Sequence, residues 1–400
     1  MKKFLLLTAA AGLLGASSLQ AQQTDIYITG STAFRSSAYN AIKSMYSTLT
    51  SENPSYSPTT SPGNSQWTMS GQMTMFGGRT IVVHALFNGS VQGVYSLYNP
   101  SSKWVFLKNA TSGDPTLVTN SATCAFSDVD SSATAYPLSP SSFVERYVAL
   151  QPFVYVRSAN APTTITNVTI QQLQTILPNG QLPLSYMTGN SADVNSTITV
   201  VDRSLDSGTR VTCFADAYVG GTPQVYYWNT NSLTYTIATN NLGPALFGPG
   251  YVGGGDVKNV LNINNANNVA FAILGLSDAK GVNGGLNILS YNGFYPSTDI
   301  KTGASVPATP AFDSVRNGQY SLWAYEVLAQ PTSVTSGDQN INGTDLTTFC
   351  RKLGGYNASE AFVGGPGSID ADIATQATRV AIRIGDMNVT RQSVGGPIAP

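Results

Sequence analysis

Charged side chains are scarce in this sequence of 400 residues. They make up 10% of the chain, and the formal net charge is −1. Because so few charges cannot build a basic face, nothing in the composition attracts nucleic acid or an anionic membrane. Any anion site must therefore be built locally, from backbone N–H groups, hydroxyl groups and one or two well-placed arginines.

Histidine occurs only once, as His84, which excludes a His-rich metal site. A Ser-His-Asp triad would depend on this one residue. His84 lies in the apolar run 80–87, and we interpret it as a strand residue without a catalytic role. The sequence also lacks a G-x-S-x-G elbow, a Walker loop and an H-E-x-x-H motif. We therefore expect neither an enzyme nor a bound metal or cofactor.

The cysteines are few as well. Cys124, Cys213 and Cys350 are an odd number spread over the whole chain, without the spacing of a metal motif. This pattern is not a disulfide framework. At most one bridge can form, and the sequence leaves its existence open.

Long hydrophobic runs are missing except near the N-terminus. There the basic start Met1-Lys2-Lys3 leads into the apolar stretch 4–16, the pattern of a signal peptide. Cleavage is expected after Ala21, with Ser18 as the alternative, and no Cys follows that could carry a lipid. Because no later apolar run is long enough to cross a membrane, we expect a soluble, periplasmic or secreted protein without stable membrane insertion.

Short apolar runs alternate with helical patterns along the chain. This alternation is typical of an α/β protein with mainly parallel strands. The predicted strands cover 25–29, 80–87, 124–129, 151–156, 198–201 and 269–273, and the predicted helices cover 34–49, 167–177, 211–218 and 256–261. The polar segment 50–75 is predicted to be a surface loop or insertion.

Two strand-loop-helix junctions place small and hydroxyl residues at a helix start. They are Gly30-Ser31-Thr32-Ala33 and Ser207-Gly208-Thr209. A helix N-terminus offers unpaired N–H groups and a partial positive charge, and glycine lets an anion approach the chain closely. Each junction is therefore a candidate half-site for an oxyanion. The alternative is that Thr32 and Ser207 only cap their helices.

Three further side chains could complete such a site. Arg203 ends a predicted strand four residues before Ser207, where its guanidinium can bind an anion in a bidentate manner. Asp128 lies at the end of the short predicted strand that begins at Cys124. Its carboxylate could accept the proton of monohydrogen phosphate and would repel sulfate. Ser90 could add a hydroxyl and an N–H group. The alternatives are that Asp128 is a turn or cap residue and that Ser90 belongs to an ordinary turn.

The order of these motifs resembles that of the phosphate-binding proteins of bacterial phosphate ABC transporters, which are type II periplasmic binding proteins. The resemblance covers roughly residues 24–330 and is most specific at Arg203-x-x-x-Ser207-Gly208-Thr209. The other motifs that carry it are Gly30-Ser31-Thr32, Gly89-Ser90, Phe126-Ser127-Asp128, 167–173, 253–257, 269–276 and 292–297. The sequence departs from the family pattern at four places. Phe34 follows Thr32 by two positions instead of one, and Asn88-Gly89-Ser90 lacks the usual longer Gly/Ser run. The insertion at 50–75 is unusual, and the tail from about 335 has no counterpart.

The resemblance implies an α/β fold of two domains with a hinged ligand cleft. It implies domain I at 22–150 and 270–335, domain II at 151–269, and a C-terminal extension at 336–400 that packs on domain I. The chain would cross between the domains near Pro152-Phe153 and Val269–Ala272. The implied ligand residues are Thr32, Ala33 through its N–H, Ser90 and Asp128 from one domain, and Arg203, Ser207, Gly208 and Thr209 from the other.

The implied function is the binding of phosphate or a related oxyanion by a monomer that serves an ABC transporter permease. Two other functions stay open. A secreted surface or matrix protein could keep the fold without a ligand. A phosphatase is the enzyme alternative, although the sequence offers it neither metal ligands nor a paired nucleophile and base.

Overall fold

The computed structural model describes residues 23–54, 65–221, 224–239, 249–334 and 341–400. The predicted signal peptide over residues 1–21 lies outside these ranges. Among the helices within them, none combines the length and the apolar character that a membrane span requires.

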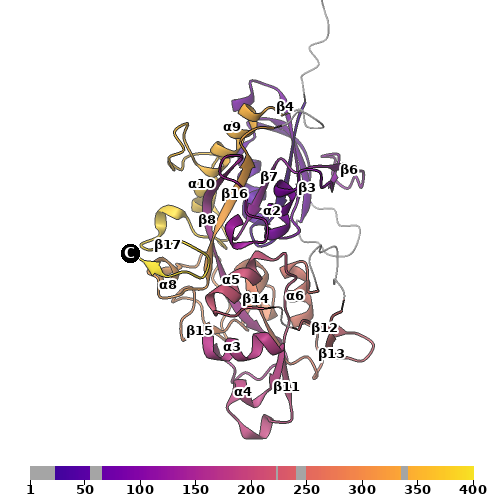
Figure 1. Cartoon of the computed structure of the whole chain (residues 1–400), viewed down its shortest axis with the longest axis vertical. Coiled ribbons are helices and arrows are strands. Elements are labelled where there is room, and N and C mark those ends of the chain that lie inside the picture. Colours follow the sequence, from indigo (N-terminus) through magenta and orange to yellow (C-terminus); the bar gives the residue numbers. More distant parts are fainter. Residues whose placement is uncertain (1–22, 55–64, 222–223, 240–248, 335–340) are drawn as a thin grey trace, which may run out of the picture.

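A mixed sheet of ten strands runs through the molecule (Figure 1). In spatial order its strands are β10 (Gln181–Pro183), β11 (Thr197–Val200), β14 (Ala270–Gly275), β8 (Phe143–Arg157), β16 (Trp323–Pro331), β7 (Cys124–Ser127), β1 (Thr24–Gly30), β4 (Thr80–Leu86), β3 (Gln66–Gln72) and β2 (Thr48–Asn53). The predicted α/β class is confirmed. The expectation of mainly parallel strands is wrong, because β8 and β16 pair in opposite directions and β2, β3 and β4 form an antiparallel meander.

Helices connect and cover these strands. They are α1 (Arg35–Met45), α2 (Ser90–Tyr98), α3 (Ile170–Asn179), α4 (Ser185–Thr188), α5 (Gly208–Asp216), α6 (Gly254–Leu261), α7 (Leu276–Ala279), α8 (Asp313–Arg316), α9 (Gly343–Gly354) and α10 (Ile369–Thr375). Two-stranded pairings complete the fold: β5 (Trp104–Leu107) with β6 (Leu117–Asn120), β9 (Asn167–Val168) with β15 (Ser290–Tyr291), β12 (Tyr226–Asn229) with β13 (Thr234–Ile237), and β17 (Thr390–Arg391) with β18 (Ile398–Ala399).

The segment 50–75 is not a surface loop where the structure describes it. Strands β2 and β3 pair there in antiparallel register, and β3 continues the sheet beside β4. Trp67 and Met69 alternate along β3 and are fully buried. This period of two is the strand signal that the many Ser and Thr residues around it concealed. Leu49 lies in β2 and not in the predicted helix, because the backbone becomes extended at Tyr46, directly after α1.

The molecule has two main hydrophobic cores, and we call the parts of the chain around them the first and second lobes. In the first lobe α1, α9 and α10 pack on one face of the sheet, where Ile42, Phe349 and Ile373 share a core with Phe126 of β7. Its opposite face is covered by α2, which packs on Ala125, because successive strand residues point to opposite faces. The second lobe holds α3, α5 and α6 around β11, β14 and the end of β8.

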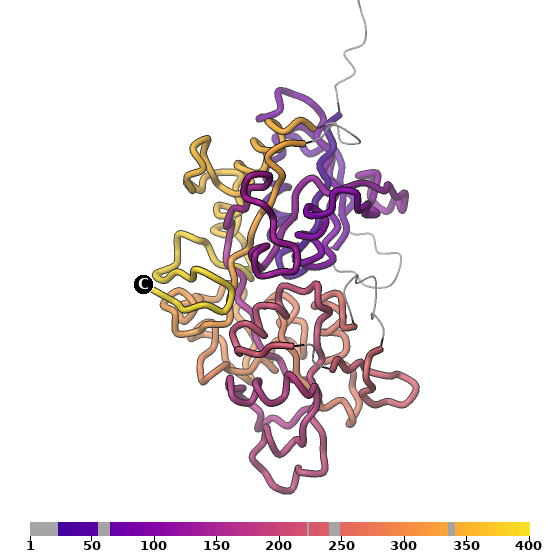
Figure 2. Tube along the Cα trace, viewed as in Figure 1, coloured from indigo at the N-terminus to yellow at the C-terminus, as the bar shows by residue number. Residues whose placement is uncertain are grey.

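The chain crosses between the lobes along β8 and β16, which lie side by side (Figure 2). Strand β8 pairs with β16 as far as Pro152 and with β14 from Phe153 onward, so the first crossing lies where it was predicted. The second crossing is β16 and not 269–272. After β14 the chain stays in the second core through Leu322. The assignment of 270–335 to domain I therefore does not fit this packing, and we propose boundaries near 152 and 323.

The C-terminal extension contacts both lobes. Helices α9 and α10 pack on the first core, in line with the predicted position on domain I. From Ile382 onward, however, the apolar side chains pack on the second core. Between these two parts, the backbone of Ile382 exchanges two hydrogen bonds of 2.9 Å with Leu150 of β8, close to the crossing. The extension thus spans the region where the two lobes join.

Arg391 fastens the end of this extension to the second lobe. Its guanidinium is buried, pairs with Asp216 at the end of α5 at 3.1 Å, and lies over the ring of Trp323. Removing the guanidinium would leave a buried carboxylate without its charge partner. We expect Arg391→Met to lower the free energy of unfolding by about 3 to 5 kcal/mol, measured by urea denaturation.

Lys43→Met is the matched control for this substitution. Lys43 pairs with Glu52 at 2.8 Å, but both side chains are partly exposed. Such a surface pair contributes at most about 1 kcal/mol. Equal losses in the two variants would contradict the role given to Arg391.

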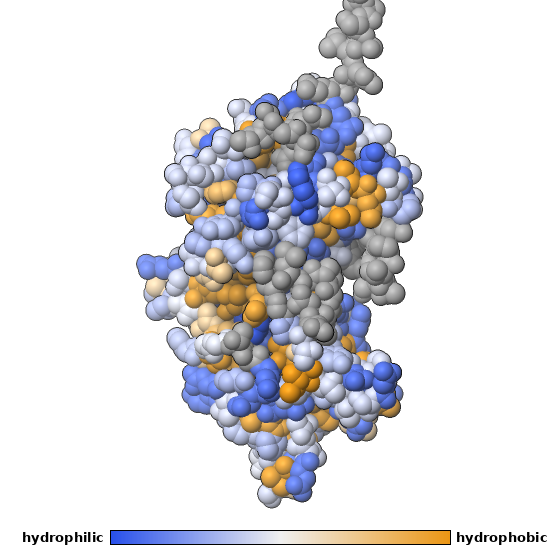
Figure 3. Space-filling model, turned by 45° about the vertical axis from the view of Figure 1, so that its right-hand side comes forward, coloured by the Kyte–Doolittle hydropathy of each residue, from blue (hydrophilic) through white to orange (hydrophobic). Residues whose placement is uncertain are grey.

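Two of the three cysteines lie together. Cys350 in α9 and Cys124 in β7 are free thiols, both fully buried in the first core, and the proximity of Cys124 adds to the effect of burial in raising the pKa of the Cys350 thiol. Cys213 lies in the second lobe, with its sulfur 2.5 Å from the hydroxyl of Tyr155. All three cysteines are free thiols in the structure, so the single bridge that the sequence allows is not formed there. On the surface, Figure 3 shows hydrophobic side chains in several separate patches on the visible face.

Candidate functional site

The first predicted half-site lies between β1 and α1. Gly30 has a φ of +127°, and a Cβ there would collide with the backbone of Phe126, so this turn requires glycine. The hydroxyl of Ser31 accepts a hydrogen bond from the N–H of Phe34 at 3.3 Å. The N-cap of α1 is Phe34, without a side-chain cap, and the Thr32 hydroxyl accepts a hydrogen bond from Arg203 instead, so the alternative that Thr32 caps the helix is wrong.

The second half-site is the start of α5. The hydroxyl of Ser207 accepts a hydrogen bond from the N–H of Arg210 at 3.3 Å, so its predicted alternative role as a helix cap is confirmed. A Cβ on Gly208 would collide with a carboxylate oxygen of Asp128 and lie 2.7 Å from the Cβ of Ser90. Only glycine therefore allows the first turn of α5 to approach the first lobe this closely.

Ser90 is the first residue of α2 and does not belong to an ordinary turn. Its hydroxyl donates a hydrogen bond to Asp128. The next residue, Val91, donates its N–H to the carbonyl of Asp206 at 3.0 Å, which ties α2 to the loop before α5. This contact is one of several that hold the two lobes together here.

Arg203 reaches from the second lobe toward the first. Its Nη2 donates to the Thr32 hydroxyl at 3.2 Å and to the Val252 carbonyl at 2.6 Å, while Nε donates to the Tyr251 carbonyl at 3.2 Å. The side chain is 2% exposed. Burial lowers the pKa of the guanidinium, and nearby carboxylates, Asp128 first among them, oppose this effect. Within the described ranges no carboxylate forms an ion pair with Arg203, so its charge is held in place by neutral acceptors.

Asp128 lies where the two lobes meet. The hydroxyl of Thr209 in α5 donates to its Oδ2 at 3.2 Å, and Ser90 donates to its other oxygen. Burial raises the pKa of the Asp128 carboxyl, while the bond from Ser90, the charge of Arg203 and the bond from Thr209 oppose this rise. Asp128 is therefore not a simple turn residue.

The structure thus gathers the predicted site residues at the junction of the lobes. Direct contacts join Thr32 to Arg203, and join Asp128 to Ser90, Gly208 and Thr209. The remaining two, Ala33 and Ser207, are chain neighbours of these residues and are buried as well. The arrangement combines one cation, several hydroxyl groups, a helix N-terminus and one carboxylate, which are the groups that a protonated oxyanion requires.

The chain is similar to solved phosphate-binding proteins. A protein of Clostridium perfringens, described as a phosphate ABC transporter substrate-binding protein with bound phosphate, is 12% identical over 90% of this chain and 99% of its own, with a TM-score of 0.47. An ABC-type phosphate transport receptor of Vibrio cholerae is 14% identical over 82% of this chain and 94% of its own, with a TM-score of 0.40. A phosphate-binding protein of Stenotrophomonas maltophilia is 13% identical over 89% of this chain and 90% of its own, with a TM-score of 0.42.

No family model and no curated protein matches the chain. The solved structures belong to the kind of protein that the sequence motifs resemble. At these identities and TM-scores the likeness concerns the path of the chain alone, and the ligands in their descriptions are properties of those proteins.

Two features of the junction were not predicted. Arg35, the first residue of α1, forms an ion pair with Asp278 of α7 in the second lobe, with Nη2 2.9 Å from Oδ1. The carbonyls of Tyr251 and Val252 hold Arg203. Arg35 could have been noticed in the sequence, because it is a charged residue directly after a predicted binding loop in a chain with few charges. No local pattern marks the carbonyls of Tyr251 and Val252.

His84 has the structural role that was predicted. It lies in β4, stacks on Tyr27 with 4.5 Å between ring centroids, and its ring nitrogens face the Leu107 carbonyl at 2.7 Å and Asp25 at 3.2 Å. In the part of the chain that is described, no three His, Cys, Asp or Glu residues are grouped to hold a metal ion.

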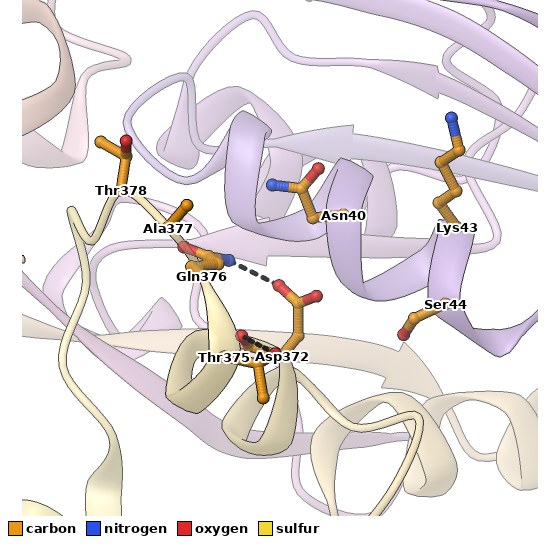
Figure 4. Close-up of a pocket in the computed structure, with 8 residues that line it drawn as sticks. All are labelled: Asn40, Lys43, Ser44, Asp372, Thr375, Gln376, Ala377 and Thr378. Carbon is orange, nitrogen blue, oxygen red and sulfur yellow. Dashed lines mark hydrogen bonds between the residues drawn. The ribbon is translucent and has the colours of Figure 1, made fainter. Parts of the chain in front are cut away.

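A separate pocket of about 460 Å³ lies between α1 and α10 (Figure 4). Its lining is polar and shares no residue with the predicted site. The Lys43 ammonium, the cation of this lining, already pairs with Glu52. The pocket therefore gives no support to a second anion site.

Proposed function

We propose that this chain binds inorganic phosphate, or a similar tetrahedral oxyanion, between its two lobes and catalyses no reaction. The observation that carries the proposal is the gathering of hydrogen-bond donors around one buried carboxylate, Asp128. The donors are the Arg203 guanidinium and the hydroxyl groups of Thr32, Ser90 and Thr209.

The donor set suits an oxyanion because charged and neutral donors are strong in a site from which water is excluded. Asp128 would accept the proton of monohydrogen phosphate, an interaction that sulfate cannot offer. The first-turn N–H groups at Gly208 and Thr209 would contribute further donors. Closure of the lobes would enclose the ligand, and opening would release it.

We further propose that the protein is exported and delivers its ligand, as a monomer, to an ABC transporter permease. The signal-peptide pattern and the motif resemblance support this role. The alternative is a ligand-free surface protein, and the direct contacts between the lobes, such as Arg35 with Asp278, favour it because they close the lobes without a ligand.

Thermal unfolding separates the two functions. A ligand at 100 times its dissociation constant stabilises the folded state by about 2.7 kcal/mol. We expect phosphate to raise the melting temperature, while sulfate at equal ionic strength serves as the control. A melting temperature that is the same in phosphate and in sulfate would favour the ligand-free protein.

A further inference from the structure

A second buried carboxyl group, that of Glu326, lies beside the proposed phosphate site. Strand β16 pairs with β7 through Val327 opposite Ser127 and Leu328 opposite Phe126. One more step in this antiparallel register places Glu326 next to Asp128, at the point where β7 ends. There β16 has an irregularity between Glu326 and Val327, and Glu326 pairs with β8 instead.

The surroundings of the two carboxyl groups differ sharply. Asp128 accepts hydrogen bonds from Ser90 and Thr209. Glu326 is fully buried, and neither of its oxygens has a hydrogen-bond partner of normal geometry in the described part of the chain. Burial and the charge of Asp128 raise the pKa of Glu326 well above its ordinary value, and only the neighbouring Ser31 hydroxyl opposes this.

Several charged groups on the elements around Glu326 form ion pairs with one another. They are Arg35 with Asp278, Arg146 of β8 with Glu360, Arg351 of α9 with Glu360, and Asp370 of α10 with Arg383. Helix α2, which also touches β16, contains no charged residue. Within the described residues, no cation donates a hydrogen bond to Glu326 or forms an ion pair with it, and Arg203 is bound to neutral acceptors beside Asp128. Each of two adjacent buried carboxyl groups makes ionisation of the other less favourable, and Glu326, which has no hydrogen-bond partner of normal geometry in the described chain, is the one less suited to carry the charge.

We propose that uncharged Glu326 is a positioning residue that keeps a further negative charge from standing beside Asp128. This inference rests on the proposed function. Glu326 also lies beside Ser31, which belongs to the same loop as Thr32. Because burial and the charge of Asp128 raise the pKa of Glu326, its neutral form persists to a higher pH than in an exposed glutamate and is lost as the pH rises. A second buried negative charge then faces the bound anion, so Glu326 sets the upper pH limit of phosphate binding.

The test compares the phosphate affinity of the full chain with that of Glu326→Gln from pH 6 to pH 10. The amide keeps the size of the side chain but cannot ionise. Taking the ratio of the two dissociation constants removes the effects of phosphate and Asp128 ionisation, which both proteins share. We expect similar affinities at pH 6 and a wild type that binds about tenfold or more weakly than Glu326→Gln at the alkaline end.

Glu145→Gln is the matched control. Glu145 lies on β8 like the neighbours of Glu326, but it is exposed, and its carboxylate accepts hydrogen bonds from Ser131 at 2.8 and 3.0 Å. Its affinity ratio to wild type should not change with pH. A constant ratio for Glu326→Gln as well, with both proteins binding phosphate, would overturn this inference and leave the proposed function intact.

A second readout does not require a ligand. Infrared difference spectra of wild type minus Glu326→Gln at pH 7 should contain the carbonyl band of a protonated carboxyl group. If the variant does not fold, the same band in the wild type should disappear on alkaline titration. Absence of the band would overturn the protonated state of Glu326, whereas loss of phosphate binding in every protein would contradict the proposed function instead.

Discussion

Asp128→Asn should change which anion the protein prefers. A site that is built around a hydrogen bond from the ligand can discriminate by roughly 10⁴-fold, so the wild type should bind phosphate and ignore sulfate. The amide keeps the shape of the carboxylate, removes the repulsion and offers an N–H₂ donor to a fully ionised anion. The phosphate-to-sulfate affinity ratio should therefore fall in the variant, measured for both proteins at one pH and one salt concentration.

Asp130→Asn is the control for this experiment. Asp130 lies two residues further along, and its carboxylate accepts a hydrogen bond from Tyr147 at 2.8 Å, outside the proposed site. The affinity ratio of this variant should equal that of the wild type. If Asp128→Asn also leaves the ratio unchanged, Asp128 does not contact the anion and the phosphate assignment loses its best support.

Arg203→Ala should abolish tight phosphate binding. The guanidinium is the buried cation at the junction, and it lies within hydrogen-bond reach of Thr32 in the opposite lobe. Losing a charge-assisted bidentate contact in a buried site costs about 2 to 5 kcal/mol of binding free energy. Calorimetric titration of the variant with phosphate measures this loss.

Two further variants separate binding from structure, because Arg203 also holds the carbonyls of Tyr251 and Val252. Arg203→Lys keeps the charge but not the bidentate geometry and should bind with intermediate affinity. Arg79→Ala removes a cation that pairs with Asp345 in the first lobe, and should bind as the wild type does. An Arg203→Ala protein with wild-type affinity would exclude this residue from the site.

The loops of the proposed site could be picked out because each is local in sequence. Gly30, Gly208 and the hydroxyl residues next to them have to stand at specific positions between a strand and a helix, so they leave a short pattern. Arg203 stands at a fixed spacing before Ser207 for the same reason. What no local pattern reveals is that these loops meet, since contacts such as that between Thr209 and Asp128 join residues far apart in the chain.

The parts that were missed depend on long-range pairing. Strand β3 pairs with β4, and β16 returns the chain to the first lobe, only because the complete sheet offers them partners. Without knowledge of these partners, the polar composition of residues 50–75 indicated a loop. Glu326 did leave a signal, as the one charged residue in the apolar run 323–329, but its relation to Asp128 comes from the register of β16 with β7. Register is fixed by the neighbours of a strand and cannot be read from the strand alone.

Calorimetric titration of the wild-type chain with phosphate, followed by sulfate and arsenate, tests the central claim most directly. One site between two lobes predicts saturable binding of one phosphate per chain. Arsenate, which is protonated like phosphate, should displace it, and sulfate should not. The absence of any binding of phosphate, or binding of sulfate as tight as that of phosphate, would contradict the account.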